Sequence, residues 1–363
     1  MTDRIVTISD MHFGVKDSTL TNPAIVDTFL EELSEGGKID ELILLGDVFD
    51  LWKNVPSKAI ADSKYFMSGI GKIANKITYV IGNHDHHIFL MAQENKFLGG
   101  LKQSKIEDIS FSPEQEFGRS VLEGLISSEC NISVRYARYW KEHFGTKILF
   151  MHGHHLDGLQ TSAPVIITSI DFFISWIRLL IATIRLLLAK LLKRRKLLKL
   201  GSEENFEVAL ASTYETLYRN AISEERVIIE NGLWLIPSLF GLFWSRICKT
   251  LRFTPIQQMY SGIESYLNRL RERPGVFVYG HTHAADAYKK GKGVLAVNTG
   301  CWLLEEDPRV WKNPEQIPNT YVIIDDAITV KQLGKKEPIV PPFPMKDVAT
   351  LEFGGRKSII IQK

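Results

Sequence analysis

Five short apolar runs set the strongest limit on what this chain can fold into. Each is rich in β-branched or aliphatic residues and ends at Gly, Asp, Asn or His, which is typical of buried strands bounded by turns. The runs occupy residues 4–9, 41–46, 77–82, 147–153 and 276–281. Helical patterns separate the first three runs, and the clearest, at residues 23–37, ends at a Gly pair. This alternation predicts an α/β fold in which helices cover a sheet.

The end of the chain carries two further strand patterns. Residues 293–300 form one, and residues 320–333 form a hairpin that turns at Asp325 and Asp326. Beyond residue 334 the sequence KKEPIVPPFP predicts an extended, irregular tail, because proline is incompatible with a regular helix interior.

About 120 residues separate the fourth strand from the fifth, and their pattern is mainly helical. We therefore expect a catalytic domain made of residues 1–155 and 275–333, an inserted helical cap at 156–274, and a C-terminal tail at 334–363. The cap holds 16 Lys and Arg against 11 Asp and Glu, so it carries +5 while the rest of the chain carries −3. A basic and apolar segment is thus inserted into a slightly acidic body.

Composition excludes several classes of protein. The hydrophobic share of 45% and charged share of 24% are those of a globular chain, and a net charge of +2 gives no strong nucleic-acid signal. The 3 cysteines are widely spaced and form no disulfide or zinc-ribbon pattern, which fits a reducing compartment. The first residues lack the features of a signal peptide, so we expect a cytoplasmic location.

Nine of the 10 histidines fall in four clusters, and each cluster directly follows a predicted strand. The clusters are His12; His84, His86 and His87; His152, His154 and His155; and His281 and His283. Oxygen ligands accompany them, namely Asp10, Asp47, Asp50, Asn83 and Asp85. The carboxyl ends of strands are where α/β sheets place functional loops, so we expect these side chains to meet.

This donor set predicts a metal centre. Imidazole mixed with carboxylate suits divalent transition metals, with Mn favoured here and Fe, Zn or Co as alternatives. There are enough donors for two ions. A bridged pair of ions clamps a phosphate and lowers the pKa of a bound water, which is the chemistry of phosphoester hydrolysis.

Five sequence blocks carry a family resemblance. They are Asp10-Met11-His12, Gly46-Asp47-Val48-Phe49-Asp50, Gly82-Asn83-His84-Asp85, Met151-His152-Gly153-His154 and Gly280-His281-Thr282-His283. In this order they resemble the signature blocks of calcineurin-like metallophosphoesterases, over about residues 1–155 and 275–333. The resemblance implies a two-sheet β-sandwich flanked by helices, with a dinuclear metal centre.

The resemblance also implies a role for each site residue. Asp10, His12 and His283 resemble the ligands of a first metal, and Asn83, His152 and His281 those of a second, with Asp47 as the bridging carboxylate. His84 resembles the group that contacts the scissile phosphate, and we expect Asp85 to orient its ring. We expect Asp50 to support the ligands, and His154 either to support them or to bind substrate phosphate. The remaining histidines, including His143, are expected to be structural or exposed.

Two segments of the cap bear on the substrate. Residues 165–199 are amphipathic and very apolar, with Asp171, Arg178 and Arg185 on one narrow stripe and eight basic residues between 178 and 199. Residues 231–245 contain no charged residue. Such segments favour peripheral binding to an anionic membrane surface. The alternatives are that they form the cap's own core, or that they span the bilayer, against which the interrupting charges count.

The block Gly46–Trp52 adds a second resemblance, to the UDP-2,3-diacylglucosamine pyrophosphohydrolase branch. This branch commonly has Arg where this chain has His84, and its insertion is shorter. We therefore expect hydrolysis of a phosphoester or pyrophosphate bond in a lipid-linked substrate at a membrane surface. The competing interpretations are a nuclease or nucleotide phosphodiesterase with a soluble substrate, and a non-catalytic binding module on the same fold.

Overall fold

The structure is a computed structural model of the chain. It describes residues 3–51, 55–89, 91–92, 95, 99, 114–117, 122, 124–126, 130–156, 256, 260, 263–264, 266–268, 270–304 and 317–348. The chain divides into two compact units, one made of Met1–Leu156 with Ser245–Lys363 and the other of Asp157–Trp244. The second unit, with the membrane-binding segments predicted at 165–199 and 231–245, lies outside the described residues.

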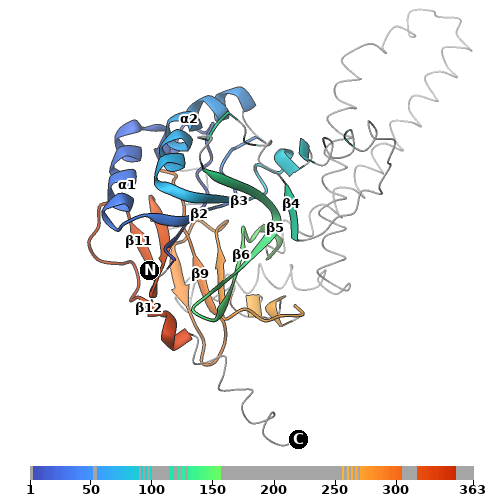
Figure 1. Cartoon of the computed structure of the whole chain (residues 1–363), viewed down its shortest axis with the longest axis vertical. Helices are drawn as coiled ribbons and strands as arrows, with labels where there is room; N and C mark the ends of the chain where they lie inside the picture. The colour runs from blue at the N-terminus through green and yellow to red at the C-terminus, as the bar shows by residue number, and fades with distance from the viewer. Residues whose placement is uncertain are drawn as a thin grey trace, which may run out of the picture. The chain divides into compact units, whose positions relative to one another are not determined.

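The described part alternates strands with helices over its first half (Figure 1). The helices are α1 (Pro23–Glu35) and α2 (Pro56–Ile73), with single 3-10 turns at η1 (Thr19–Thr21) and η3 (His154–Leu156). The strands are β1 (Ile5–Ile8), β2 (Ile39–Leu45), β3 (Ala74–Val80), β4 (Glu114–Phe117), β5 (Asn131–His143), β6 (Thr146–Met151), β7 (Val276–Tyr279), β8 (Asp286–Tyr288), β9 (Leu295–Asn298), β10 (Thr320–Ile324), β11 (Ala327–Gln332) and β12 (Phe343–Pro344).

The strands form one mixed sheet in the order β12-β11-β10-β1-β2-β3-β5-β6-β7-β9-β8, with β4 paired to β5. The long strand β5 joins its two halves. Residues 131–135 of β5 run parallel to β3, whereas residues 138–143 run antiparallel to β6. In the second half β6, β7 and β9 are mutually parallel.

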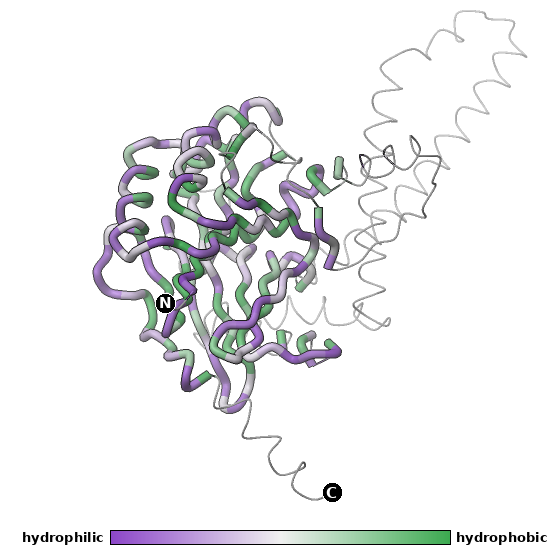
Figure 2. Tube along the Cα trace, viewed as in Figure 1, coloured by the Kyte–Doolittle hydropathy of each residue, from purple (hydrophilic) through white to green (hydrophobic). Residues whose placement is uncertain are grey.

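The two halves of the sheet face each other across an apolar core. Ile5, Ile43 and Val80 of the first half belong to the same buried cluster as Phe150 and Val278 of the second. In Figure 2 the trace through the middle of the described part carries many hydrophobic residues. The α/β fold predicted from the strand pattern is confirmed, and so are the two-layered sheet and flanking helices that the family resemblance implied.

Helices α1 and α2 cover the outer face of the first half. The Asn22 side chain caps α1 by accepting the Ala24 N–H at 3.0 Å, and Pro23 occupies the first turn. Buried aromatic rings of Phe29 and Phe66 lie between the helices and the sheet, and Phe29 contacts Trp302 with ring centroids 4.8 Å apart. Each such fully buried ring stabilises the fold by about 2 kcal/mol.

The fold differs from the sequence prediction at strands β4, β5 and β8, which were not predicted, and in the tail. Strand β5 was not predicted, because NISVRYARYWKEH mixes polar and apolar residues without a regular alternation. The tail predicted to be irregular begins with loops but then supplies β12, which pairs with β11 at the sheet edge, and buries Met345 and Val348. Proline is tolerated in β12 because an edge strand has a free N–H side. None of the described helices is long and apolar enough to cross a membrane.

Candidate metal centre

The predicted ligands meet because their strands end at the same edge of the sheet. Backbone hydrogen bonds tie the loops together there: Asp10 N donates to Gly46 O at 3.1 Å, and His12 N donates to Asp47 O at 2.9 Å. From the other half of the sheet, Gly280 N donates to His152 O at 2.9 Å. Loops from β1, β2, β6 and β7 therefore form one rigid floor.

The backbone of this floor is strained where the donors sit. Five of the predicted ligands have a left-handed backbone, with φ of 54° at Asp10, 48° at His12, 51° at Asp47, 67° at His281 and 57° at His283. A positive φ is uncommon outside glycine and costs free energy, and such residues concentrate at functional sites. Glycine is needed beside them, because a Cβ at Gly46 would lie 2.5 Å from the His152 ring.

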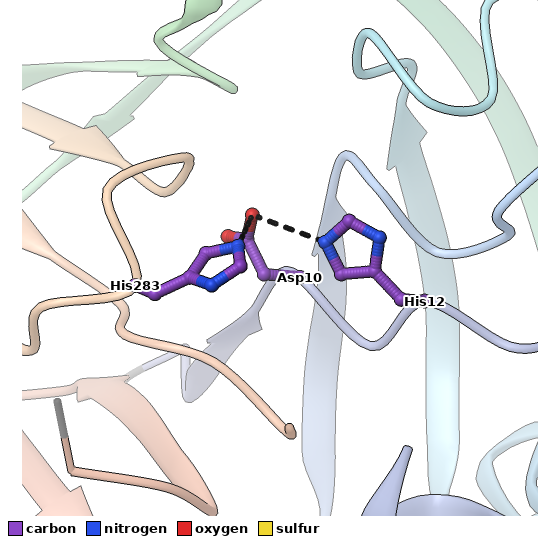
Figure 3. Close-up of side chains that lie close together, drawn as sticks. All are labelled: Asp10, His12 and His283. Atoms are coloured by element: carbon purple, nitrogen blue, oxygen red, sulfur yellow. Dashed lines mark ion pairs between the residues drawn. The ribbon is translucent and has the colours of Figure 1, made fainter. Parts of the chain in front are cut away.

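The first donor group consists of Asp10, His12 and His283 (Figure 3). Asp10 Oδ1 lies 3.2 Å from His283 Nε2 and 3.9 Å from His12 Nε2. Asp10 Oδ2 faces away from them and accepts hydrogen bonds from His281 N, at 2.9 Å, and from the Ser9 hydroxyl. One carboxylate oxygen is thus fixed by the protein and the other is directed at the two imidazoles.

The second donor group consists of Asp47, His152 and His281, with Asn83 beside them. His152 Nδ1 lies 2.9 Å from the Leu45 carbonyl, which can only accept, so this nitrogen carries a proton. His152 Nε2 faces Asp47 Oδ2 and Asn83 Oδ1, each at 3.1 Å. This is the arrangement of a ligating imidazole whose tautomer is set by its other nitrogen.

Asp47 lies between the two groups. Its Oδ2 is 3.1 Å from His152 Nε2 in the second group and 3.8 Å from His12 Nε2 in the first. Its Oδ1 accepts the His84 N–H at 2.8 Å, which fixes the carboxylate plane. Asp47 therefore occupies the position that a bridging carboxylate requires.

The donors fit a pair of divalent cations. Asp10 Oδ1 and His12 Nε2 are buried and have no hydrogen-bond partner within the described ranges. Burial lowers the pKa of His12 to about 4, with His283 and His84 adding to this, so His12 is a neutral ligand at pH 7. Burial also disfavours charge on His152, but Asp47 and Asp10 outweigh it and raise its pKa to about 9. A site that attracts a proton so strongly is one that attracts a cation.

The environment of His84 corrects one predicted role. Asp85 was expected to orient the His84 ring, but its carboxylate accepts from Gly82 N at 2.6 Å, Val48 N at 2.8 Å and the Tyr79 hydroxyl. Neighbouring side chains of a loop point in different directions, and here Asp85 points under the loop. Asp50 takes the expected place, with Oδ1 3.4 Å from His84 Nδ1. His84 also contacts His12, with ring centroids 4.7 Å apart.

The other histidines occupy distinct surroundings. His154 is buried beside the second group, its ring 5.5 Å from that of His152 and 6.4 Å from that of His281. His86 Nδ1 lies 2.8 Å from the Asn83 carbonyl. His143, outside the site, holds the Asp325 carbonyl through Nε2 at 2.7 Å. The side chain of His155 lies outside the described residues.

Three polar residues at the site were not singled out from the sequence. Ser9 and Thr299 are fully buried behind Asp10, and Asn298 is fully buried behind the loop of His281 and His283. The sequence carried a signal for two of them, because Ser9 precedes a predicted ligand and Asn298 lies near the end of a predicted strand. Ser, Asn and Thr are nevertheless ordinary turn residues, so the signal is weak.

Comparison with known proteins gives the class. The sequence pattern of the family described as calcineurin-like phosphoesterase matches residues 3–182, which contain four of the five blocks. The fifth block, with His281 and His283, lies beyond the matched range, and the structure brings it to the same site. The protein is a metal-dependent phosphoesterase. Over residues 3–182 it is similar to the calcineurin-like phosphoesterase family.

The solved structures to which the chain is similar are distant from it. One is a predicted phosphoesterase from Streptococcus pneumoniae, at 14% identity, covering 95% of this chain and 98% of that one with a TM-score of 0.31. Another is a dimetal phosphatase from Danio rerio, at 13% identity, covering 94% and 99% with a TM-score of 0.37. A search of curated proteins found no match. The family assignment therefore depends on the sequence match and the site.

Proposed function

We propose that this phosphoesterase uses two divalent transition-metal ions, with Mn favoured, to hydrolyse a phosphoester or pyrophosphate bond in a lipid-linked substrate at a membrane surface. The position of Asp47 Oδ2 between the two donor groups carries the two-ion part of the proposal. The apolar and basic pattern of residues 165–199 supports the lipid part.

The residues divide the chemical work. Two bound divalent ions supply Lewis acidity toward phosphate and a water of lowered pKa. Asp10, His12 and His283 would hold one ion, Asn83, His152 and His281 the other, and Asp47 both. Strained, hydrogen-bonded loops keep these donors at a fixed spacing, so little reorganisation accompanies the reaction.

His84 is the candidate proton donor to the leaving oxygen. Its side chain is 17% exposed, so it is partly accessible from outside, unlike the fully buried His152. Asp50 beside Nδ1 stabilises the protonated ring, which is the form able to donate. The backbone of His84 is held in place because its N–H donates to Asp47 Oδ1.

The lipid part of the proposal depends on attraction to a membrane. Residues 178–199 contain eight basic and no acidic residues, and the apolar face of 165–199 would insert among acyl chains. Segment 231–245 adds a second uncharged stretch. Similarity of Gly46–Trp52 to the UDP-2,3-diacylglucosamine pyrophosphohydrolase branch points to a nucleotide-linked lipid pyrophosphate as the first substrate to try. A protein of this kind would act from the cytoplasm, bound peripherally to the membrane.

The proposal is tested by vesicle flotation combined with two hydrolysis assays, one with a lipid substrate and one with a soluble substrate. The wild type should float with anionic but not with neutral vesicles, and should release nucleotide from a UDP-linked acylated sugar in those vesicles when Mn is added. The double variant R194E/R195E should lose flotation and lipid turnover but keep hydrolysis of a soluble chromogenic phosphodiester.

The double variant K335E/K336E is the matched control, because it makes the same charge change at two exposed positions of the β11–β12 connection. It should float like the wild type. A wild type that stays in the soluble fraction and hydrolyses only soluble nucleotides or nucleic acid would overturn the lipid proposal in favour of a nucleotide phosphodiesterase or nuclease. Absence of any metal-dependent turnover would overturn the catalytic proposal itself.

A further inference from the structure

The turn after β9 lies against both donor groups. Strand β9 pairs in parallel with β7, and Asn298 is in register with Tyr279. Asn298, the last residue of β9, and the two residues after it are therefore neighbours of the loop Gly280–His283. That loop supplies His281 to the second donor group and His283 to the first.

The Asn298 side chain clamps this loop. Its Nδ2 donates to the Gly280 carbonyl and to Thr282 Oγ1, both at 2.9 Å. Its Oδ1 accepts the Gly300 N–H at 2.9 Å, which settles the orientation of the amide, because a carbonyl must face the N–H donor. A single fully buried amide thus fixes the backbone on either side of His281 and next to His283.

Thr299 acts on Asp10 through Ser9. Ser9 Oγ is hydrogen-bonded to Asp10 Oδ2 and lies 2.5 Å from Thr299 Oγ1. An ionised carboxylate can only accept, so Ser9 gives it its one proton. Thr299 then donates to Ser9 across the 2.5 Å contact rather than to the Tyr279 carbonyl, which lies 3.3 Å from the same hydroxyl. The hydrogen bonds therefore run from Thr299 to Ser9 and from Ser9 to Asp10. The Ser9 hydroxyl occupies Asp10 Oδ2, so Asp10 Oδ1 is left to face the imidazoles of the first donor group.

The turn is itself held from the other half of the sheet. Thr320 of β10 donates from its hydroxyl to the Thr299 carbonyl at 2.8 Å and accepts the Cys301 N–H at 3.2 Å. The close approach requires Gly300, which has φ of 74° and whose added Cβ would collide with the Thr320 hydroxyl. The turn therefore has a defined position rather than that of a free loop.

We propose that Ser9, Asn298 and Thr299 are positioning residues for the two metal ions: Asn298 sets the spacing of His281 and His283, and the Thr299–Ser9 relay aims Asp10 at the first ion. The inference rests on the two-ion centre of the proposed function. Partners of this kind behind metal ligands typically change metal affinity by tenfold or more when removed.

Metal counting with matched variants tests it. Chelator-treated protein is titrated with Mn alone in a calorimeter, and bound Mn per chain is measured after desalting. T299V should bind one Mn like the wild type and the other about tenfold more weakly. T299S keeps the hydroxyl and should restore wild-type affinity, whereas N298A should weaken both ions.

The control is T146V, which makes the same change at a fully buried threonine whose hydroxyl has no hydrogen-bond partner among the described residues. T299V breaks the hydrogen bond to Ser9 and should lower the thermal midpoint of the metal-free protein more than T146V does, whereas T146V should bind both Mn ions like the wild type. If T299V and S9A bind two Mn with wild-type affinities, the positioning role is overturned even where the midpoint falls. If the wild type itself binds fewer than two Mn, the two-ion proposal fails first, so the two failures are distinguishable.

Discussion

Glu41 and the pair Asp10 and Asp47 are all buried carboxylates, but they are neutralised in different ways. Glu41 has its own cations: Lys141 Nζ at 2.6 Å and Lys76 Nζ at 2.9 Å, together with the Thr78 hydroxyl. Asp10 and Asp47 face only histidines, backbone N–H groups and the Ser9 hydroxyl, and within the described ranges no lysine or arginine pairs with either.

The difference separates a structural charge cluster from a binding site. Burying a carboxylate is costly unless its charge is paired and its oxygens are hydrogen-bonded. The fold supplies the pairing at Glu41. At Asp10 and Asp47 it supplies neutral donors on rigid loops and leaves the positive charge to come from outside. The same contrast predicts which substitutions affect catalysis and which affect stability.

The largest effect is expected from D47N. Losing the shared carboxylate should lower kcat/KM by about a thousandfold, because the charge that holds both ions is gone. Steady-state kinetics with Mn and a soluble phosphodiester measures this. D62N is the control, since Asp62 pairs with Lys58 one helical turn away on α2 and belongs to neither donor group. Turnover within tenfold of wild type in D47N would contradict a shared ligand.

The second largest effect is expected from removal of the metal ions. The folded chain binds the ions and the unfolded chain does not, so at free Mn a hundredfold above Kd each site should raise the free energy of unfolding by about 2.7 kcal/mol. Chemical denaturation with and without chelator should show this loss for the wild type and little of it for D47N. Equal unfolding curves for the wild type in both conditions would contradict a resident metal.

Removing the charge of Glu41 should act on stability alone. E41Q leaves Lys76 and Lys141 beside a neutral amide and should lower the free energy of unfolding by about 2 kcal/mol, less than for a fully buried pair because both lysines reach solvent. Chemical denaturation of chelator-treated wild type and E41Q measures this difference in the free energy of unfolding. E31Q, at an exposed position of α1, should change little. Loss of bound Mn in E41Q would mean that the two carboxylate clusters are not separate.

The smallest effect is the pH dependence of the difference in unfolding free energy between the wild type and E41Q. Burial raises the pKa of Glu41, but Lys141, Thr78 and Lys76 together outweigh it, so the pKa lies below the usual 4.5 in the folded protein. A depressed folded pKa means that the stabilisation is present above pH 4.5 and is lost as pH falls through the folded value. Denaturation curves of the wild type and E41Q should therefore converge with acidification. A gap that widens toward acid would contradict the assignment.

The sequence predicted that the candidate ligands would meet, because each of them follows a strand. Asp10, Asp47 and His152 each follow a strongly apolar strand, and parallel strands bring such ends together whatever the loops do. Strand β5 was missed because its residues pair with two different neighbours and are partly exposed, which removes any regular alternation.

Side-chain direction was harder to predict than position in the chain. Asp85 is adjacent to His84 and looked like its partner, while Asp50, which faces the ring, comes from another strand. Only the fold decides which of two carboxylates points at an imidazole. The same holds for Asn298 and Thr299, whose contacts with Gly280 and Ser9 join residues far apart in the chain.

The central claim is that two ions flank Asp47, and anomalous diffraction from crystals grown with Mn tests it most directly. The account predicts two peaks roughly 3.5–4 Å apart on either side of Asp47 Oδ2. One should touch Asp10, His12 and His283, and the other Asn83, His152 and His281. A single peak, or Mn bound elsewhere with Asp47 coordinating nothing, would contradict it.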